Sequence, residues 1–251
     1  METEELYYPQ IKVQVGQYSF DQGIEIEVCS ARSSHSDWAK IRFTEQFQPK
    51  IALNRKDPAS VLLGYGGVLS QVFTGYITKP FGGGDRAGEA SMKDDMLLLE
   101  ETAINDTFLS TTPQELISFF LAKAGVTKMK LSSKAYPRRK VLPIRRQNAV
   151  QAIETVNNAW GIQFPFFFSD GVFYWGETPD QDKVYTFEYG VNILRLERRG
   201  GLWDLETVSV PFVKHSHKIN VIHPLISGER EVSKVAFSTN DSGFIRTHIY
   251  F

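Results

Sequence analysis

Apolar and polar side chains alternate along most of the first hundred residues of the chain. Residues 11–15 and 24–28 each carry an apolar side chain at every second position, with lysine, glutamine or glutamate between them. A period of two is typical of a β-strand that has one buried and one solvated face. The same kind of pattern, interrupted by glycine clusters at Gly64 and Gly82 that suit turns, predicts further strands at residues 38–43, 60–67, 68–79 and 90–99.

The pattern becomes helical after Asp106. The run Thr112-Pro113-Gln114-Glu115 is a capping box with proline at the first helical position, and apolar residues recur at helical spacing from there to Gly125. A second helix is expected over residues 148–160, where one stripe is apolar and Gly161 follows as the C′ residue.

An aromatic hairpin is expected after the second helix, with strands at 162–168 and 172–175 around Ser169-Asp170-Gly171. The chain then returns to strands, which are predicted at residues 183–189, 193–198, 206–212, 233–237 and 244–251. The order is therefore β-rich, then helix, helix and hairpin, then β-rich. This order predicts an α+β fold that is mainly β, divided into residues 1–105, 106–182 and 183–251.

Composition narrows the class of protein. The 251 residues are 42% hydrophobic and 13% aromatic, which is enough for a sizeable core and suits pleated sheets. The 28 basic and 29 acidic residues give a net charge of −1, which argues against a generic binder of nucleic acids or other polyanions. The uncharged stretch 58–78 is about long enough to span a bilayer, but glycines interrupt it, so it is interpreted as two strands and a turn.

The single cysteine, Cys29, cannot form an internal disulfide. We therefore expect a fold held by its core and assembled in a reducing compartment. Residues 1–5 are acidic and no apolar run follows them, so no signal peptide is predicted.

The near-zero net charge conceals a segregation of charge along the chain. Residues 122–148 contain nine basic residues and no acidic one, whereas residues 85–115 contain eight acidic residues against Arg86 and Lys93. Such a pattern suits complementary contacts between subunits, or a basic face that meets an acidic partner. The alternative is a solvated surface whose charges pair within the monomer, and the sequence leaves both interpretations open.

No compact catalytic or nucleotide-binding motif is found. The glycine clusters at Gly64 and Gly82 lie between strands and lack the Lys-Ser or Lys-Thr of a phosphate loop. Cys29 would need a partner such as His35 to act as a nucleophile, but nothing basic flanks it, so it is interpreted as a small residue at a strand end.

Three histidines lie close together in the sequence. His215 and His217 are two positions apart and would share one face of a strand, as metal ligands can. No acidic residue is near, so we interpret them, with His223, as solvated strand histidines. A pair of catalytic carboxylates is defined only by separation in space, and the candidates are scattered over Asp94, Asp95, Glu100 and Glu101. We predict no catalytic residue, no cofactor and no metal site.

Four features of the sequence together resemble a known family. They are the β-rich opening, the run Val72-Phe73-Thr74-Gly75-Tyr76-Ile77, the capped helix that begins at residues 112–117, and the helix, glycine and aromatic hairpin over residues 149–175. In this combination the chain resembles the tail hub proteins of contractile phages. That group includes the late control gene D proteins and the N-terminal part of the VgrG proteins of type VI secretion.

The resemblance implies a structural protein without enzymatic activity. Its expected architecture is two tube-type antiparallel β-barrel modules with a helix-helix-hairpin segment between them. The family forms homotrimers, each a pseudo-six-fold ring that joins the hexameric tail tube to the trimeric spike. The implied partners are further copies of the chain, the tail tube protein, the spike protein and other baseplate proteins, with DNA or cargo only passing through the channel and no membrane insertion. The implied location is the tail baseplate of a virion, assembled in the host cytoplasm.

Subunit interfaces are predicted from the central strand of the first module, from the basic stretch and from the last strand. The residues are Phe73, Tyr76, Arg138, Arg139, Arg145, Arg146, Tyr250 and Phe251. For the last strand, an ordinary paired last strand of the second module is the favoured interpretation.

Two other functions stay open at the level of sequence. The chain could be another tail component with a tube-like barrel, such as a distal tail or tube-capping protein. A function of a different class is a β-rich cell-wall hydrolase or a carbohydrate-binding module that uses exposed Trp160, Trp175 and Trp203, because fold analogy alone does not exclude an enzyme.

Overall fold

The computed structural model describes residues 6–44, 50–82, 88–239 and 244–251. The fold is α+β and mainly β, with large antiparallel sheets, which confirms the predicted fold class. The chain divides into two compact units. Unit 1 consists of Met1–Asp94 and Pro179–Phe251, and unit 2 consists of Asp95–Thr178.

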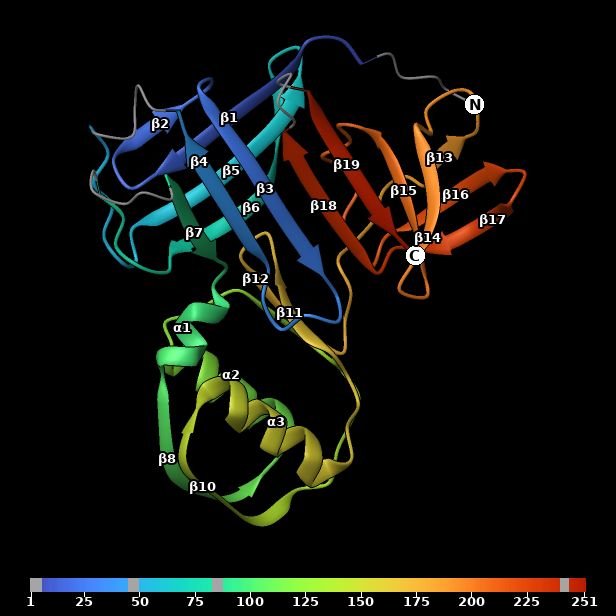
Figure 1. Ribbon diagram of the computed structural model, residues 1–251. Helices are drawn as coiled ribbons and strands as arrows, with labels where there is room; N and C mark the ends of the chain where they lie inside the picture. Colours follow the sequence, from blue (N-terminus) through green and yellow to red (C-terminus); the bar gives the residue numbers. More distant parts are fainter. Residues whose placement is uncertain (1–5, 45–49, 83–87, 240–243) are drawn as a thin grey trace. The chain divides into compact units, whose positions relative to one another are not determined.

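Unit 1 contains one antiparallel sheet of eleven strands (Figure 1). Its strand order is β14-β15-β19-β18-β3-β4-β7-β6-β5-β1-β2. In chain order the strands are β1 (Pro9–Val15), β2 (Tyr18–Phe20), β3 (Ile24–Ala31), β4 (Trp38–Phe43), β5 (Pro58–Tyr65), β6 (Val68–Ile77), β7 (Glu89–Lys93), β14 (Arg195–Arg199), β15 (Leu202–Val208), β18 (Lys234–Thr239) and β19 (Ile245–Tyr250).

The two halves of unit 1 meet where β3 pairs with β18. Val28 lies opposite Phe237 in this pair, and the Ile26 N–H donates to Thr239 Oγ1 at 2.9 Å. Figure 1 accordingly shows the blue strand β3 between β4 and the red strand β18. Strands that are far apart in sequence therefore share one continuous hydrogen-bonded sheet.

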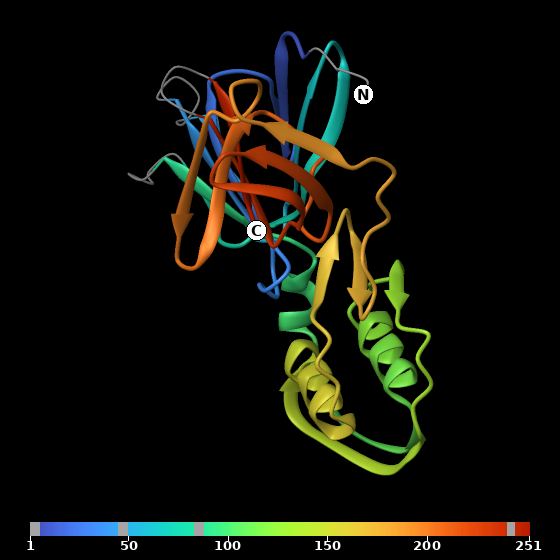
Figure 2. The ribbon, with the colours of Figure 1, turned by 90° about the vertical axis from the view of Figure 1, so that its right-hand side faces the viewer.

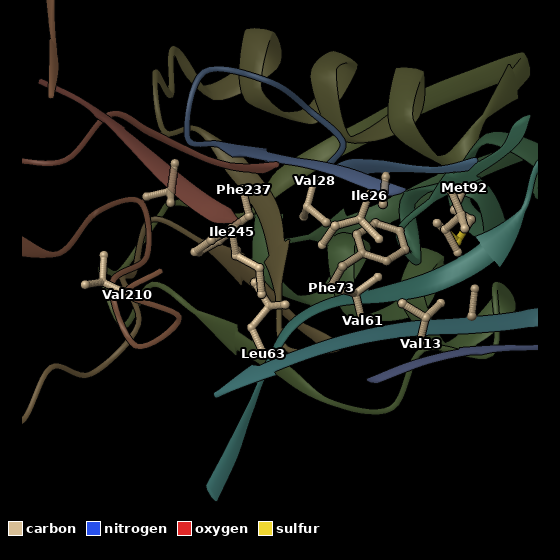
Figure 3. Packing of buried hydrophobic residues seen from close by; sticks show 14 of the residues in the cluster. Val13, Ile26, Val28, Val61, Leu63, Phe73, Met92, Val210, Phe237 and Ile245 are labelled. Atoms are coloured by element: carbon tan, nitrogen blue, oxygen red, sulfur yellow. The ribbon is translucent and has the colours of Figure 1, made fainter. Parts of the chain in front are cut away.

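The core of unit 1 lies on one face of this sheet. Alternate residues of each strand point into it, as the period of two predicts, and Figure 3 shows side chains from β1, β3, β5, β6 and β18 packed together. The sheet curves back on itself, which brings the ring of Phe20 in β2 to a centroid distance of 5.3 Å from the ring of Phe43 in β4. Residues from both sequence segments of unit 1 thus bury one common cluster.

A second, smaller sheet of unit 1 has the strand order β13-β16-β17. Its strands are β13 (Tyr185–Glu188), β16 (Lys218–His223) and β17 (Ile226–Glu231). Phe187, Ile219 and Val221 point from this sheet into the same core cluster. The small sheet thus packs against the same core as the eleven-stranded sheet.

Unit 2 surrounds a separate core with helices and short strands (Figure 2). The helices α2 and α3 lie side by side, and β8 and β10 form a two-stranded antiparallel ribbon beside them. The elements are α1 (Met96–Glu101), β8 (Ala103–Thr111), α2 (Pro113–Lys123), β9 (Met129–Leu131), β10 (Arg139–Asn148), α3 (Ala149–Trp160), β11 (Phe166–Ser169) and β12 (Val172–Trp175).

Both predicted helices and the predicted hairpin of unit 2 are confirmed. Thr112 and Asn148 each close a capping box at the start of α2 and α3, and Gly161 ends α3 in the left-handed conformation at φ 64°. Asp170 and Gly171 both have positive φ, as a two-residue turn of type I′ requires between β11 and β12.

One predicted element of the first half is wrong, and several others were missed. The strand expected at residues 90–99 ends at Lys93, and a helix begins at Met96. Residues 139–148, part of the basic stretch, form strand β10, which pairs with β8. The strands β16 and β17 follow the histidine-containing segment, whose own residues 215–217 lie in a turn. Of the turn expected around Gly82, residues 83–87 lie outside the described residues.

Candidate functional site

Phe73, a predicted interface residue, lies in the core of unit 1. Its side chain is 4% exposed, and Figure 3 shows its ring among Ile26 and Val61. The neighbouring Gly75 has no room for a side chain, because a Cβ there would lie 2.1 Å from the Lys93 carbonyl oxygen. Packing within unit 1 therefore accounts for the phenylalanine and the glycine of the Phe-Thr-Gly run. The Phe73 ring is not available on the surface.

Tyr76 and Tyr250 lie on the face of the large sheet that points away from the core. Tyr76 alternates with the buried residue Ile77, and Tyr250 alternates with the buried residue Ile249. The Lys234 ammonium lies 4.7 Å from the centre of the Tyr250 ring. Burial, together with the nearby Asp204 carboxylate, raises the pKa of Tyr250 to about 12. Both predicted tyrosines are thus partly exposed on one polar sheet face.

The buried carboxylate of Asp204 lies on the same face, next to Tyr250. Asp204 is 3% exposed, and its Oδ1 lies 2.9 Å from His248 Nδ1. Arg199 Nη1 lies 3.7 Å from Asp204 Oδ2. A buried carboxylate needs partners of this kind because burial without them is costly. Asp204 thus links β14, β15 and β19 through its contact with His248 and its ion pair with Arg199.

Phe251 is tied to the sheet by its backbone. Its N–H and C=O both bond with Trp203, at 3.2 and 2.9 Å, and its ring packs against the core cluster. Strand β19 lies between β15 and β18, so its two edges are both paired. This arrangement agrees with the interpretation as an ordinary paired strand.

Two of the predicted basic residues have partners within unit 2. Arg138 forms an ion pair with Glu115, and Arg139 donates to the Ala159 carbonyl oxygen at 2.6 Å while its guanidinium lies 5.8 Å from the Trp160 ring centre. The N–H of Thr112, followed by Arg138, holds the pKa of Glu115 below its usual range. Arg138 and Arg139 thus fasten the ends of α2 and α3.

Arg145 and Arg146 occupy a β-bulge in strand β10. The pairing of β10 with β8 shifts register between Ile144 and Gln147, and Arg146 has a left-handed φ of 52°. The Arg146 N–H donates to Asn105 Oδ1 at 3.3 Å. Both arginine side chains are exposed, so the bulge presents two adjacent positive charges at the surface.

The histidines differ from the prediction. His215 and His217 are buried, at 1% and 7% exposure, and lie in a turn rather than on a solvated strand. Burial, assisted by the positive charge of Arg32, lowers the pKa of His215 to about 4, so the ring is neutral at neutral pH. His223 sits at the end of β16, where its ring meets the Tyr189 ring edge-on at 4.8 Å. Backbone hydrogen bonds join Ser216 and His217 of this turn to Val232, and the local sequence does not reveal this contact.

The other chemistry considered from the sequence finds no support in the described part of the chain. No group of three or more His, Cys, Asp or Glu residues there has the geometry of a metal site. Burial raises the pKa of the Cys29 thiol, which makes it a poorer nucleophile. Trp175 was predicted to be exposed for a carbohydrate-binding alternative, but it is fully buried and donates to Asn157 Oδ1 at 2.8 Å. None of the helices in the described residues is long and apolar enough to cross a membrane.

Two exposed surfaces of unit 1 were not found from the sequence. The first, here called the apolar knob, consists of Tyr189, Val191, Leu194 and Leu225. The second, here called the edge hollow, is a cavity of about 550 Å³ lined by Pro9, Gln10, Ile11, Lys12, Ser19, Asp21 and Leu69. The residues of the apolar knob lie outside the regular strands, where hydrophobic residues follow no period that could reveal their exposure. The edge hollow is lined mainly by residues of β1, β2 and β6, which only the folded sheet brings together.

In comparisons with known proteins, no family model and no curated protein matches the sequence. Solved structures match it over nearly its whole length. The 43 kDa tail protein of prophage MuSo2 from Shewanella oneidensis has a TM-score of 0.73 at 10% identity, covering 97% of this chain and 97% of that chain. A tail protein from Neisseria meningitidis MC58 has a TM-score of 0.72 at 12% identity, covering 97% and 96%.

A third similar structure is the E. coli c3393 protein, a component of the type VI secretion system that exhibits structural similarity to T4 bacteriophage tail proteins gp27 and gp5. Its TM-score is 0.68 at 13% identity, covering 95% of this chain and 76% of that chain. At sequence identities this low, the comparisons establish likeness of fold alone. The chain therefore has the fold of these phage tail and type VI secretion proteins over almost its entire length.

Proposed function

We propose that this protein is a structural component of a phage or phage-like contractile tail. In the specific form of the proposal it is the baseplate hub: a homotrimer that forms a pseudo-six-fold ring between the hexameric tail tube and the trimeric spike. The observation that carries the proposal is the full-length match to two tail proteins and to a type VI secretion component. A match of both compact units together is more specific than a match of one common module.

The arrangement of unit 1 is compatible with such a ring. Seven strands from residues 9–93 and seven strands from residues 185–250 contribute to it, and the two groups join through β3 and β18. We propose that each group is one tube-type β-barrel module. Two related modules per chain would let three chains present six similar positions to a hexameric tube, which resolves the mismatch of symmetry.

The proposed partners follow from this role. They are other copies of the chain, the tail tube protein, the spike protein and other baseplate proteins in a virion tail, with DNA or cargo passing through the channel. The protein acts mechanically, by transmitting the thrust of the tube to the spike, and it performs no covalent chemistry.

Light scattering coupled to size-exclusion chromatography tests the proposal. We expect a trimer of the isolated chain, or a monomer that becomes a trimer in the presence of its spike protein. A stable hexamer would instead indicate a tube protein. A peptidoglycan-release assay with robust turnover would contradict the structural role and support a cell-wall hydrolase.

A further inference from the structure

The ribbon formed by β8 and β10 in unit 2 carries a contiguous apolar surface on its outward face. Figures 1 and 2 show α2 and α3 on the inner side of this ribbon, where Phe108 and Leu142 point into the core of unit 2. Leu109 and Val141 alternate with these residues, lie directly opposite each other, and are 68% and 51% exposed. Pro143, two positions after Val141, is exposed on the same face. Because opposite residues of an antiparallel pair have neighbouring side chains, Leu109, Val141 and Pro143 form one surface, here called the ribbon patch.

The basic stretch of the sequence leaves unneutralised positive charge on the same ribbon. Lys140, Arg145 and Arg146 of β10 have exposed side chains, and no other residue in the described ranges forms an ion pair with any of them. The acidic residue of these two strands, Asp106, is paired with Lys123 of α2. The margin of the ribbon patch is therefore positive, and the described part of unit 2 does not balance this charge.

The β-bulge in β10 fixes the backbone that carries two of these charges. The Arg146 N–H donates to Asn105 Oδ1 at 3.3 Å, and the pairing of the two strands resumes at Gln147, which lies opposite Ile104. Groups on a backbone that is already ordered lose less conformational entropy when they bind. An apolar centre with a polar margin is the usual anatomy of a protein interface, and arginine is enriched there.

The chemistry of the ribbon patch favours one kind of partner. Potentials across an interface are complementary, so a positive margin suits a partner that is acidic, and two copies meeting through this same patch would bring like charges together. A nucleic acid is a poorer fit, because the aliphatic centre of the patch neither neutralises phosphates nor offers rings on which bases stack. Pro143 supplies no N–H in the middle of β10, which disfavours the addition of a further strand at that edge. The contact is therefore expected through side chains of the outward face.

We propose that the ribbon patch is a docking surface for an acidic surface of a different protein. Apolar side chains of the partner cover Leu109 and Val141, and its carboxylates face Lys140, Arg145 and Arg146. This inference goes beyond the proposed function, because it concerns a contact with a different protein and holds whether or not the chain forms a trimer.

Binding of synthetic peptides to the full chain tests the proposed chemistry. The probe is a short fluorescent peptide in which glutamate and leucine alternate. We expect fluorescence anisotropy to show binding that weakens as the salt concentration rises. A peptide with lysine in place of glutamate should not bind, and one with serine in place of leucine should bind about 10-fold more weakly, because it lacks the apolar contacts. A single-stranded oligonucleotide of equal charge should bind more weakly than the glutamate–leucine peptide.

Substitutions on the ribbon test where the peptide binds. The double variant Arg145→Glu/Arg146→Glu should weaken binding of the glutamate–leucine peptide about 10-fold or more. Val141→Ser leaves the charge unchanged and should also weaken it. The matched control is Lys12→Glu/Lys183→Glu, which makes the same change of net charge at exposed lysines of unit 1 and should leave binding nearly unchanged. All the substituted side chains are exposed, so the fold should persist in circular dichroism.

Carbodiimide coupling locates the contact in the unaltered chain. The reagent joins an amine to a carboxylate that lies against it, so mass spectrometry should find the glutamates of the peptide linked to Lys140. Lys12 and Lys183 are exposed amines of unit 1 and should stay unlinked under the same conditions.

Three outcomes would overturn the ribbon patch as a docking surface for an acidic protein. The first is a glutamate–leucine peptide that does not bind, or that binds Arg145→Glu/Arg146→Glu as well as the wild type. The second is tighter binding of the oligonucleotide, which would indicate a nucleic acid. The third is loss of the chain's own self-association in the same double variant, which would assign the acidic surface to a second copy. The hub proposal is tested by the oligomeric state of the unaltered chain, so the two can fail separately.

Discussion

The contacts that stabilise unit 1 join residues farther apart in the sequence than the contacts that stabilise unit 2. In unit 1 the central pairing of the sheet joins β3 to β18, and one hydrogen bond across it links residues 213 positions apart. In unit 2, α2 and α3 begin with local capping boxes, and the hairpin of β11 and β12 closes through a two-residue turn. The same chain therefore contains one region specified by local signals and one specified by distant pairing.

The cores of the two units also differ in chemistry. Unit 2 buries a dense aromatic cluster, in which Trp175 contacts the rings of Phe164 and Tyr136. The core of unit 1 has a larger share of aliphatic residues, and unit 1 also buries polar groups such as His215, Asp204 and Thr247. We therefore expect the two units to respond differently to substitution and to pH, and each of the following predictions tests that difference.

The largest effect is expected from truncating a buried phenylalanine in either unit. Phe120→Ala in α2 and Phe73→Ala in β6 should each cost about 4 kcal/mol of unfolding free energy, because both remove a ring from a closed core. Hydrogen exchange measured by mass spectrometry should show faster exchange only in residues 95–178 for the first variant and only outside them for the second. Phe119→Ala is the control for α2, since Phe119 is 43% exposed and should cost much less. Equal effects of either core variant on both units would contradict the division into two independent cores.

The next effect tests the close approach of strands in unit 1. Gly75→Ala should cost about 3 kcal/mol, because its Cβ would lie 2.1 Å from the Lys93 carbonyl oxygen and the backbone of β7 would have to move. Gly82→Ala is the matched control, since a Cβ at Gly82 meets nothing within 4 Å. Chemical denaturation measures both. If the two variants are equally stable, the glycine in Phe-Thr-Gly is not required by packing.

A pH-dependent effect on the stability of unit 1 should come from His215. The ring faces Arg32, His217 and Lys214, and its pKa is about 4 in the folded protein against 6.5 when unfolded. The unfolded state therefore binds a proton between these values and the folded state does not, so stability falls as the pH decreases from about 6.5 to 4. The loss should be about 2 kcal/mol at pH 5.

Denaturation of the wild type and of His215→Gln at pH 7.5 and pH 5 measures this contribution, and the variant should lose about 2 kcal/mol less on acidification than the wild type. His223→Gln is the control, because His223 lies at the surface end of β16, and it should keep the wild-type dependence. An unchanged pH dependence in His215→Gln would show that another group is responsible.

These differences also explain what the sequence could and could not predict. The capping residues Thr112 and Asn148 and the C′ residue Gly161 act on their own neighbours, so their roles are legible in a short window. The fold class follows from the alternation of apolar and polar residues within the predicted strands. The pairing of β3 with β18 has no local signal, and neither does the burial of His215, because both depend on residues brought near only by the complete sheet.

The candidate surfaces follow the same rule. The sequence prediction places Phe73 at an interface as a residue of the strand at residues 72–77, yet the strand's alternation turns it inward and Tyr76 outward. Arg138 and Arg139 were expected to meet other subunits, but their partners Glu115 and Ala159 lie in the adjacent helices. The apolar knob is not predictable from the sequence, because loop residues such as Val191 follow no hydrophobic periodicity. The partners and exposure of surface residues therefore depend on the complete fold more than the burial of core residues does.

The smallest effect concerns the local signals of unit 2. Asn148→Ala removes the side-chain oxygen that accepts from the Gln151 N–H at 2.9 Å at the start of α3, and should cost about 1 kcal/mol. Asn148→Ser keeps an acceptor in the same place and should cost much less. The loss should be confined to unit 2 in hydrogen exchange, with the fastest new exchange in the first turn of α3. If both variants were as stable as the wild type, α3 would owe its position to packing of Ile153 and Val156 against the core rather than to its cap, and unit 2 would be less locally specified than its sequence indicates.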